Sequence, residues 1–309
     1  MQLIPIRLYA MERLSFIRYA CLLFIVLFPL MARATGQIAD DVMIDGEKWE
    51  LLGSPLSSHS DSIHKRVDAF LPKDRGGSTA NWKGFIGCWE IVDSCLYLKR
   101  IVVDMWDEHK GESYELVFDM DTLRSVLGEY YTEHGFYAEW FSQKRLIIGR
   151  GELVTYVHGG YLRNHEEELV VTIENGRITH LEHWYNKKVI EGWSCSESGF
   201  SETGKEIVKQ FPLGQFPELE SERIVVFLKN ISLTPDGHFE DCDASFFKKH
   251  DNGEKELIED PNHPIIVALK ETMRKMYPWE VIYLHGKYTV SNPNGWFTII
   301  LGRRNQAKE

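Results

Sequence analysis

The sequence predicts an α+β protein, in which an N-terminal antiparallel β-rich domain is followed by a small antiparallel sheet with one packed helix. Short β-branched and aromatic runs, separated by turn residues, fill residues 42–196 and are typical of antiparallel strands. A later segment places apolar residues at helical spacing behind Pro264, between strand-like runs. With 309 residues and 43% hydrophobic side chains, the chain is long enough to form two cores.

Residues 1–34 are predicted to be a signal peptide. Three arginines precede the apolar run Tyr19–Met31, and Ala32-Arg33-Ala34 supplies small residues for cleavage. The run is about a dozen residues long, whereas a membrane span needs roughly 20. The protein is therefore expected to be periplasmic or secreted, with no membrane span after cleavage. The alternative is a protein anchored to the membrane by an uncleaved signal.

The β-rich domain, residues 42–196, is expected to have a curved or barrel-like core, because its strands are short and closely spaced. Asp45-Gly46 favours a type I′ hairpin turn, and Asn175-Gly176 is the turn of the clearest hairpin. Gly149-Arg150-Gly151 is interpreted as a turn, and Asp121 as the cap of a short helix. The other expected elements are a hairpin at Val42–Leu52, a helix at Ser60–Leu71, a hairpin at Trp82–Met105, strands at Glu112–Phe118, Phe136–Phe141, Leu146–Ile148 and Glu152–Val157, and the hairpin Glu168–Tyr185.

Residues 197–221 are expected to link two domains through a short helix. Thr203-x-x-Glu206 has the spacing of a capping box, and the helix should end before Pro212. Residues 222–302 then form the second domain. Its expected elements are strands at Ile224–Leu233 and His238–Ala244, a polar insertion at Ser245–His263, the helix from Pro264, a turn at Gly286-Lys287 and a last strand at Trp296–Leu301.

Charge excludes one class of binding partner, and the cysteine count limits the possible disulfides. The chain has 46 acidic and 35 basic side chains, a net charge of −11, which repels phosphate backbones, so no nucleic acid partner is expected. No cofactor is implied by any motif. Four cysteines follow the signal segment, Cys88, Cys95, Cys195 and Cys242. In an oxidising compartment they permit two disulfides, including a Cys195–Cys242 link between the domains, and the alternative is four buried free thiols.

The order of elements in residues 222–302 carries a resemblance. A β-branched strand that starts at Ile224, the turn Pro235-Asp236-Gly237, a helix that opens at Pro264 and ends at Tyr277-Pro278-Trp279, and a final strand follow one another. This order is similar to that of the C-terminal domain of TonB-like periplasmic proteins. The resemblance implies a small antiparallel sheet with a helix lying on it. The long proline-rich spacer of a TonB protein is missing, since the 11 prolines are scattered.

A second resemblance covers Val42–Tyr185. Its runs Gly-Phe-Ile-Gly-Cys-Trp-Glu-Ile and Tyr-Val-His-Gly-Gly-Tyr resemble an uncharacterised secreted β domain of Gram-negative bacteria, especially Bacteroides relatives. That resemblance implies a secreted protein of a Gram-negative bacterium but does not indicate an activity.

The last strand is the main candidate binding site. In TonB-like domains the edge strand pairs with an extended segment of a partner, which is binding by strand addition. The resemblance therefore implies that an envelope protein binds at this strand. Alternatively, side chains at every second position simply fill the core. The residues concerned are Trp296, Phe297, Thr298, Ile299, Ile300 and Leu301, of which Phe297, Ile299 and Leu301 share one face.

His158 is the other candidate ligand-contacting residue. It lies in the run Tyr156–Tyr161, where Gly159 and Gly160 let the backbone approach a ligand closely. The alternative is a hydrogen-bonded histidine at the end of a strand.

No metal or catalytic site is predicted. His180 and His183 are three residues apart, and on a strand such residues point to opposite faces. The acidic clusters Glu240-Asp241-x-Asp243 and Asp119-x-Asp121 do not fit a calcium loop, and no Gly-x-Ser-x-Gly elbow is present. The sequence favours a periplasmic, non-enzymatic interaction protein. A secreted hydrolase acting on cell-surface carbohydrate or peptide near His158, or an envelope-stress or immunity protein, are the alternatives.

Overall fold

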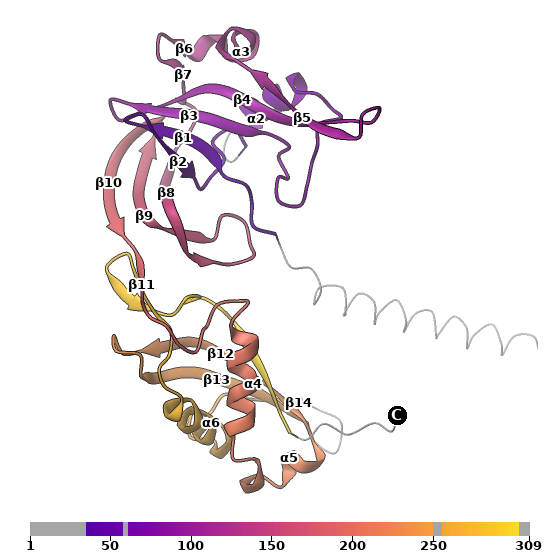
Figure 1. The fold of residues 1–309 in the computed structure, drawn as a ribbon, viewed down its shortest axis with the longest axis vertical. Helices are drawn as coiled ribbons and strands as arrows, with labels where there is room; N and C mark the ends of the chain where they lie inside the picture. The colour runs from indigo at the N-terminus through magenta and orange to yellow at the C-terminus, as the bar shows by residue number, and fades with distance from the viewer. Residues whose placement is uncertain (1–34, 58–60, 250–254, 303–309) are drawn as a thin grey trace, which may run out of the picture.

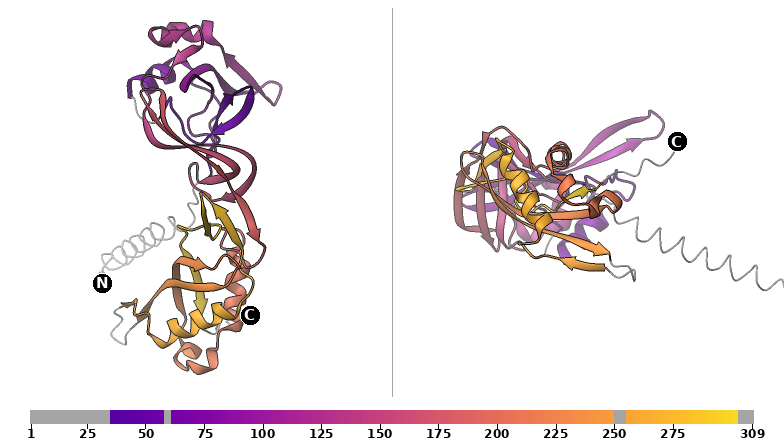
Figure 2. Two further views of the ribbon diagram at one scale, coloured as in Figure 1. Left: turned by 90° about the vertical axis from the view of Figure 1, so that its left-hand side faces the viewer. Right: turned by 90° about the horizontal axis from the view of Figure 1, so that it is seen from below.

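The computed structural model describes residues 35–57, 61–249 and 255–302, which form an elongated molecule of two lobes (Figure 1 and Figure 2). We call residues 35–186 the barrel half and residues 187–302 the sheet half. Each half has its own hydrophobic cluster, the first built from residues between Val42 and Ile173 and the second from residues between Cys195 and Leu301. The predicted signal peptide lies outside the described residues.

The strands of the barrel half form one curved sheet that closes on itself. They are β1 (Asp40–Ile44), β2 (Glu47–Leu51), β3 (Ile86–Val92), β4 (Cys95–Asp107), β5 (Glu112–Phe118), β6 (Tyr131–Thr132), β7 (Gly135–Tyr137), β8 (Gln143–Tyr156), β9 (Arg163–Glu174) and β10 (Arg177–Tyr185). The order around the barrel is β10-β9-β8-β2-β1-β3-β4, and the pairing of Arg177 in β10 with Cys95 in β4 completes the ring. The pairing is antiparallel as predicted, except that β1 runs parallel to β3.

Two helices pack onto the barrel. α2 (Asp61–Phe70) buries Ile63 and Val67, the apolar face that its spacing predicted. α3 (Met120–Leu127) starts two residues earlier than expected. Its cap is Asp119 rather than Asp121, because Asp119 has an extended backbone and its carboxylate accepts a hydrogen bond from the Thr122 amide at 3.0 Å.

The expected turn at Gly149-Arg150-Gly151 is wrong, because β8 runs through it without a break. Gly149 lies so close to the next strand that a Cβ there would be 2.5 Å from Cδ2 of His165. Gly151, with φ +83°, lies where the register of β8 with β9 shifts. Both glycines therefore serve a close strand contact and a β-bulge, two common uses of glycine inside strands.

The sheet half contains a four-stranded antiparallel sheet and a smaller one. Its elements are β11 (Lys187–Ile190), α4 (Phe200–Gln210), α5 (Glu218–Ser221), β12 (Ile224–Leu233), β13 (Phe239–Lys249), β14 (Lys255–Ile258), α6 (Pro264–Lys275), β15 (Val281–Leu284), β16 (Lys287–Thr289) and β17 (Phe297–Leu301). The larger sheet has the order β14-β13-β12-β17, and the smaller β11-β15-β16. α4 packs against β17 and α6 against β13, over the buried side of the larger sheet.

Three expectations for this region are corrected. The linker at residues 197–221 is part of the core, because Phe200, Ile207 and Phe211 are buried in the second cluster. α4 begins at Phe200, so Thr203 is no cap; its hydroxyl donates to the Ser194 carbonyl at 2.8 Å from inside the helix. The polar insertion at 245–263 continues β13 and adds β14, which extends the sheet by one strand.

The chain passes between the halves at Asn186, where β10 ends and β11 begins. β11 falls inside the range expected for the first domain, yet it pairs with β15 of the sheet half. All four described cysteines are buried free thiols, so no disulfide joins Cys195 to Cys242. Burial raises the pKa of Cys242 to about 12. Among the described helices, none has the length and apolar content required to span a membrane.

Candidate functional site

The largest hollow described lies between the two halves. It has a volume of about 830 Å³ and is walled on one side by β8 and β9 and on the other by the start of α4, the β15–β16 turn and the segment before β17. Arg145 and Asn164 come from the barrel half, and His285, Trp296 and Thr298 from the sheet half. Clefts between packed units are common ligand sites, because two surfaces can converge on one molecule there.

The β15–β16 turn carries the sheet half onto the barrel half. His285 (φ +45°) and Gly286 (φ +82°) both have left-handed backbones, the combination that a type I′ hairpin requires. The His285 amide donates to Oδ1 of Asn186 at 3.0 Å. Gly286 lies against the indole of Trp184, so closely that a Cβ would be 3.0 Å from Cζ3. A tight turn with a small residue at its tip thus anchors one half on the other.

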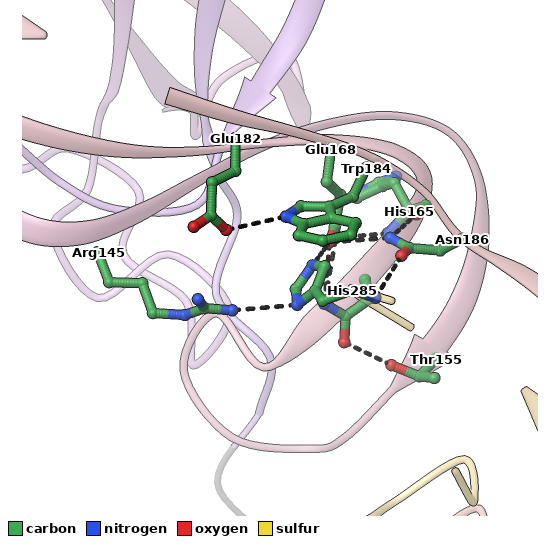
Figure 3. Close-up of polar contacts among 9 residues, drawn as sticks. Arg145, Thr155, His165, Glu168, Glu182, Trp184, Asn186 and His285 are labelled. Atoms are coloured by element: carbon green, nitrogen blue, oxygen red, sulfur yellow. Dashed lines mark hydrogen bonds and ion pairs between the residues drawn. The ribbon is translucent and has the colours of Figure 1, made fainter. Parts of the chain in front are cut away.

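The buried carboxylate of Glu168 accepts a hydrogen bond from this turn. Glu168 has no exposed surface, and its oxygens accept hydrogen bonds from the His165 amide (2.8 Å), Asn186 Nδ2 (3.0 Å) and His285 Nε2 (Figure 3). Asn164 Nδ2 adds contacts of 3.2 Å to both oxygens. A buried carboxylate is stabilised by the donors that surround it, and Glu168 has its full set only when both halves are in place.

The two hydrogen bonds of the His285 ring assign its tautomer. His285 Nε2 faces the carboxylate of Glu168 and therefore donates, which leaves Nδ1 as an acceptor. Arg145 Nη2 lies 3.0 Å from that Nδ1, and a guanidinium can only donate (Figure 3). A chain of hydrogen bonds therefore runs from Arg145 through His285 to Glu168 and positions the Arg145 guanidinium at the wall of the cleft.

The two arginines of the cleft differ in how far they are neutralised. Arg163 contacts Glu50 at 2.7 Å and donates to the Gln37 carbonyl at 2.7 Å. Within the described ranges, Arg145 makes no close ion pair with a carboxylate; its guanidinium hydrogen-bonds the imidazole of His285, and Glu182 interacts with it only electrostatically. Arg145 is therefore the charge that a ligand in the cleft would meet.

The predicted binding strand borders this cleft. β17 is an edge strand of its sheet, and among the described strands it pairs only with β12. Phe297, Ile299 and Leu301 are buried, so alternate side chains do fill the core, while Thr298 and Ile300 face the other side. Trp296 precedes the strand and is 69% exposed. Trp296, Phe297 and Thr298 line the cleft, and the last three residues of the strand do not.

His158 lies beside the cleft rather than in it. It lines a smaller hollow of about 230 Å³ together with Glu197 and Glu280. Its amide donates to Glu197 Oε2 at 2.7 Å, and its ring packs edge-on against Tyr156 with centroids 5.0 Å apart. The carboxylate of Glu280 accepts from Ser194 Oγ at 2.9 Å and pairs with Lys188 at 3.3 Å. No hydrogen bond joins the His158 ring to a nucleophile or carboxylate in the described part of the chain.

The described residues contain no group of three or more His, Cys, Asp and Glu side chains arranged to hold a metal ion. His183 pairs with Glu167 at 2.8 Å. In the acidic clusters, Asp241 pairs with Lys270 at 2.7 Å and Asp119 caps α3.

Sequence reasoning missed Arg145, Glu168, Asn186 and His285. The available signal was His285-Gly286, since histidine before glycine at a turn tolerates a left-handed backbone. Nothing in the sequence indicated which carboxylate that turn would meet. No protein-family model, curated protein or solved structure matches this chain.

Proposed function

We propose that this protein binds an extended segment of a partner protein by adding it as a strand to the free edge of β17, beside the cleft. The observation that carries the proposal is that the unpaired edge of β17 begins at the cleft wall. An edge strand presents backbone N–H and C=O groups without partners, so a peptide can extend the sheet there. The protein acts as a non-enzymatic interaction protein under this proposal.

The cleft adds selectivity to the strand edge. Arg145 carries a positive charge that makes no close ion pair among the described residues, in a chain whose net charge is −11. Trp296 is exposed at the same place and offers a broad apolar surface. A segment with an acidic side chain or a terminal carboxylate near one end therefore fits best.

We further propose that the sheet half is a TonB C-terminal-like module. It would act in the periplasm or outside the cell and bind an envelope protein. An antiparallel sheet with α6 packed on β13 and the last strand at an edge supports it.

Selection of random dodecapeptides displayed on phage against the immobilised protein tests the proposal. Enriched peptides should contain β-forming residues and an acidic group. Arg145→Glu should weaken the binding of the synthesised peptides roughly tenfold or more, since a charged hydrogen bond contributes about 1.5–3 kcal/mol. The matched control is Lys110→Glu at the exposed β4–β5 turn, which should bind as the wild type does. Failure to enrich any peptide, or equal binding to the Arg145→Glu protein, contradicts the proposal.

A secreted hydrolase remains the second candidate, because His158, Glu197 and Glu280 surround one hollow. Chromogenic glycosides and peptide anilides test it. Turnover that is lost in His158→Ala supports hydrolysis there, and no turnover with either class of substrate removes the candidate.

A further inference from the structure

The side of the β14-β13-β12-β17 sheet that faces away from α4 and α6 carries exposed apolar side chains. Val225, Phe247, Leu257 and Ile300 are 42–47% exposed, and each comes from a different strand. Buried residues alternate with them, as in Val226 between Val225 and Phe227. Isolated exposed apolar residues are ordinary, whereas a contiguous group indicates a contact surface.

The strand register places these four residues in one row. Val225 pairs with Ile300, and Phe247 pairs with Leu257. Because Val226 pairs with Phe246, the same register puts Val225 opposite Phe247. The rings of Phe227 and Phe247 lie 6.2 Å apart, which extends the group along β12. Strands lie about 4.8 Å apart, so the row crosses roughly 14 Å of sheet.

Charge is arranged beside this row. Arg223 and Lys255 are exposed and lie two residues from Val225 and Leu257, at the same end of the sheet. At the other end Lys229 lies 5.2 Å from the ring centre of Trp296, and opposite Asp243 in the register. The neighbouring carboxylates Glu222 and Glu256 alternate to the other side of the extended backbone, so the face that carries the apolar row is basic at this end, in a chain whose net charge is −11.

We propose that this sheet face is a contact site for a lipid bilayer that contains anionic phospholipid headgroups. A row with one apolar side chain from each strand presents its tips at one level, which suits a planar surface. The basic residues beside the row complement anionic headgroups, each contributing about 1 kcal/mol near a charged membrane. Trp296 lies at the margin of the face, and tryptophan favours the boundary between apolar and polar phases.

This site goes beyond the proposed peptide binding and does not depend on it. The peptide would use the edge of β17 and the cleft, whereas the bilayer would contact the face of the same sheet. Side chains on the face point away from the buried core, so substitutions there leave the core intact. Binding to lipid and binding to peptide can therefore be lost separately.

Flotation with vesicles of phosphatidylcholine, with and without phosphatidylglycerol, tests the proposal. The protein is used from residue 35 onward, because the apolar run Tyr19–Met31 would itself bind lipid. Binding should require phosphatidylglycerol and weaken between about 0.05 and 0.5 M salt. The double variant Phe247→Ser/Ile300→Ser should partition roughly tenfold less, since it removes two apolar contacts with the bilayer.

Two further variants control the result. Trp106→Ser removes a side chain that is 59% exposed on the barrel half and should leave partitioning unchanged. Arg223→Glu/Lys255→Glu should abolish the preference for phosphatidylglycerol without touching any apolar residue, which provides an answer if the serine double variant fails to fold by circular dichroism. Absence of vesicle binding, binding that ignores phosphatidylglycerol, or an equal loss in Trp106→Ser overturns the proposal. Sedimentation velocity that shows a dimer through this face, disrupted by Phe247→Ser/Ile300→Ser, also overturns it.

Discussion

At the scale of single residues, the buried carboxylate of Glu168 is where the two halves depend on each other. It lies within the barrel half, but one of its donors, His285, belongs to the sheet half. Removing the charge leaves the donors of Asn186 and His165 facing a group that cannot accept from all of them. A buried donor that is left without an acceptor destabilises the fold by more than a satisfied hydrogen bond stabilises it.

Glu168→Gln is expected to lower the free energy of unfolding by about 2 kcal/mol, within the range for leaving a buried hydrogen-bond donor without an acceptor. Urea denaturation followed by tryptophan fluorescence measures it. Glu174→Gln, an exposed carboxylate at the end of β9, is the control and should change stability little. Equal midpoints for the two variants would show that Glu168 makes no net contribution.

Glu50 gives the protein a sensitivity to acid. The imidazole of His165, whose Nε2 lies 3.4 Å from Glu50 Oε2, and next the hydrogen bonds from Arg163 lower the pKa of Glu50 from 4.5 to about 2, although burial alone would raise it. Burial would by itself lower the pKa of His165, but the contacts with Glu50 and the Gly151 carbonyl raise it. A lowered carboxyl pKa stabilises the fold above pH 4.5, and this stabilisation disappears as the pH falls through about 2.

We expect Glu50→Gln to be less stable than the wild type at pH 6 by about 1 kcal/mol, a value reduced for the partial exposure of the carboxylate. The difference should shrink steadily below pH 4.5 and vanish near pH 2. Urea midpoints at a series of pH values measure it. A difference that stays constant with pH would mean that ionisation of Glu50 does not matter.

At the scale of elements, the hairpins followed from local sequence because their turns are built from neighbouring residues. Asp45-Gly46 and Asn175-Gly176 have the left-handed backbones that their residue types favour. β8 was not predicted as one strand, because the glycines at 149 and 151 serve its close contact and bulged register with β9, which their turn-like residue types do not reveal. The start of α4 was predicted at the wrong residue, because Phe200 is buried in a core formed by residues that are distant in the sequence.

The β15–β16 turn allows a matched test of docking. Gly286 and Gly46 have the same φ of +82° in the same kind of turn, but only Gly286 has a neighbour, Trp184, within 4 Å of a built Cβ. Both Gly→Ala variants lose about 1 kcal/mol to backbone strain. Gly286→Ala should lose about 1 kcal/mol more through the clash with the indole. Thermal unfolding of the two proteins measures the difference, and equal losses would mean that the turn does not press on Trp184.

At the scale of the whole molecule, the two hydrophobic clusters share no residue, while polar contacts at Glu168 and Arg145 cross between the halves. The barrel half should therefore fold without the sheet half, but with reduced stability. The cut belongs after Asn186 rather than at Ser221, because a chain that ends at residue 220 would expose Phe200, Ile207 and Phe211.

A fragment of residues 35–186 is expected to give dispersed amide signals in NMR and a cooperative unfolding transition. Its midpoint should be lower than that of the longer chain, since Glu168 loses the donor His285. A fragment without dispersed signals would show that the barrel needs its neighbour to fold.

The sequence by itself determined the β-rich character of the first half, the helix from Pro264 and the alternation along β17, because these depend on residues close together in the chain. Only the tertiary structure decided the closure of the barrel, the edge position of β17 and the meeting of Arg145, His285 and Glu168. His285 lies 117 residues from Glu168. Their contact depends on how two separately packed cores are placed, and no local pattern of residue types encodes that placement.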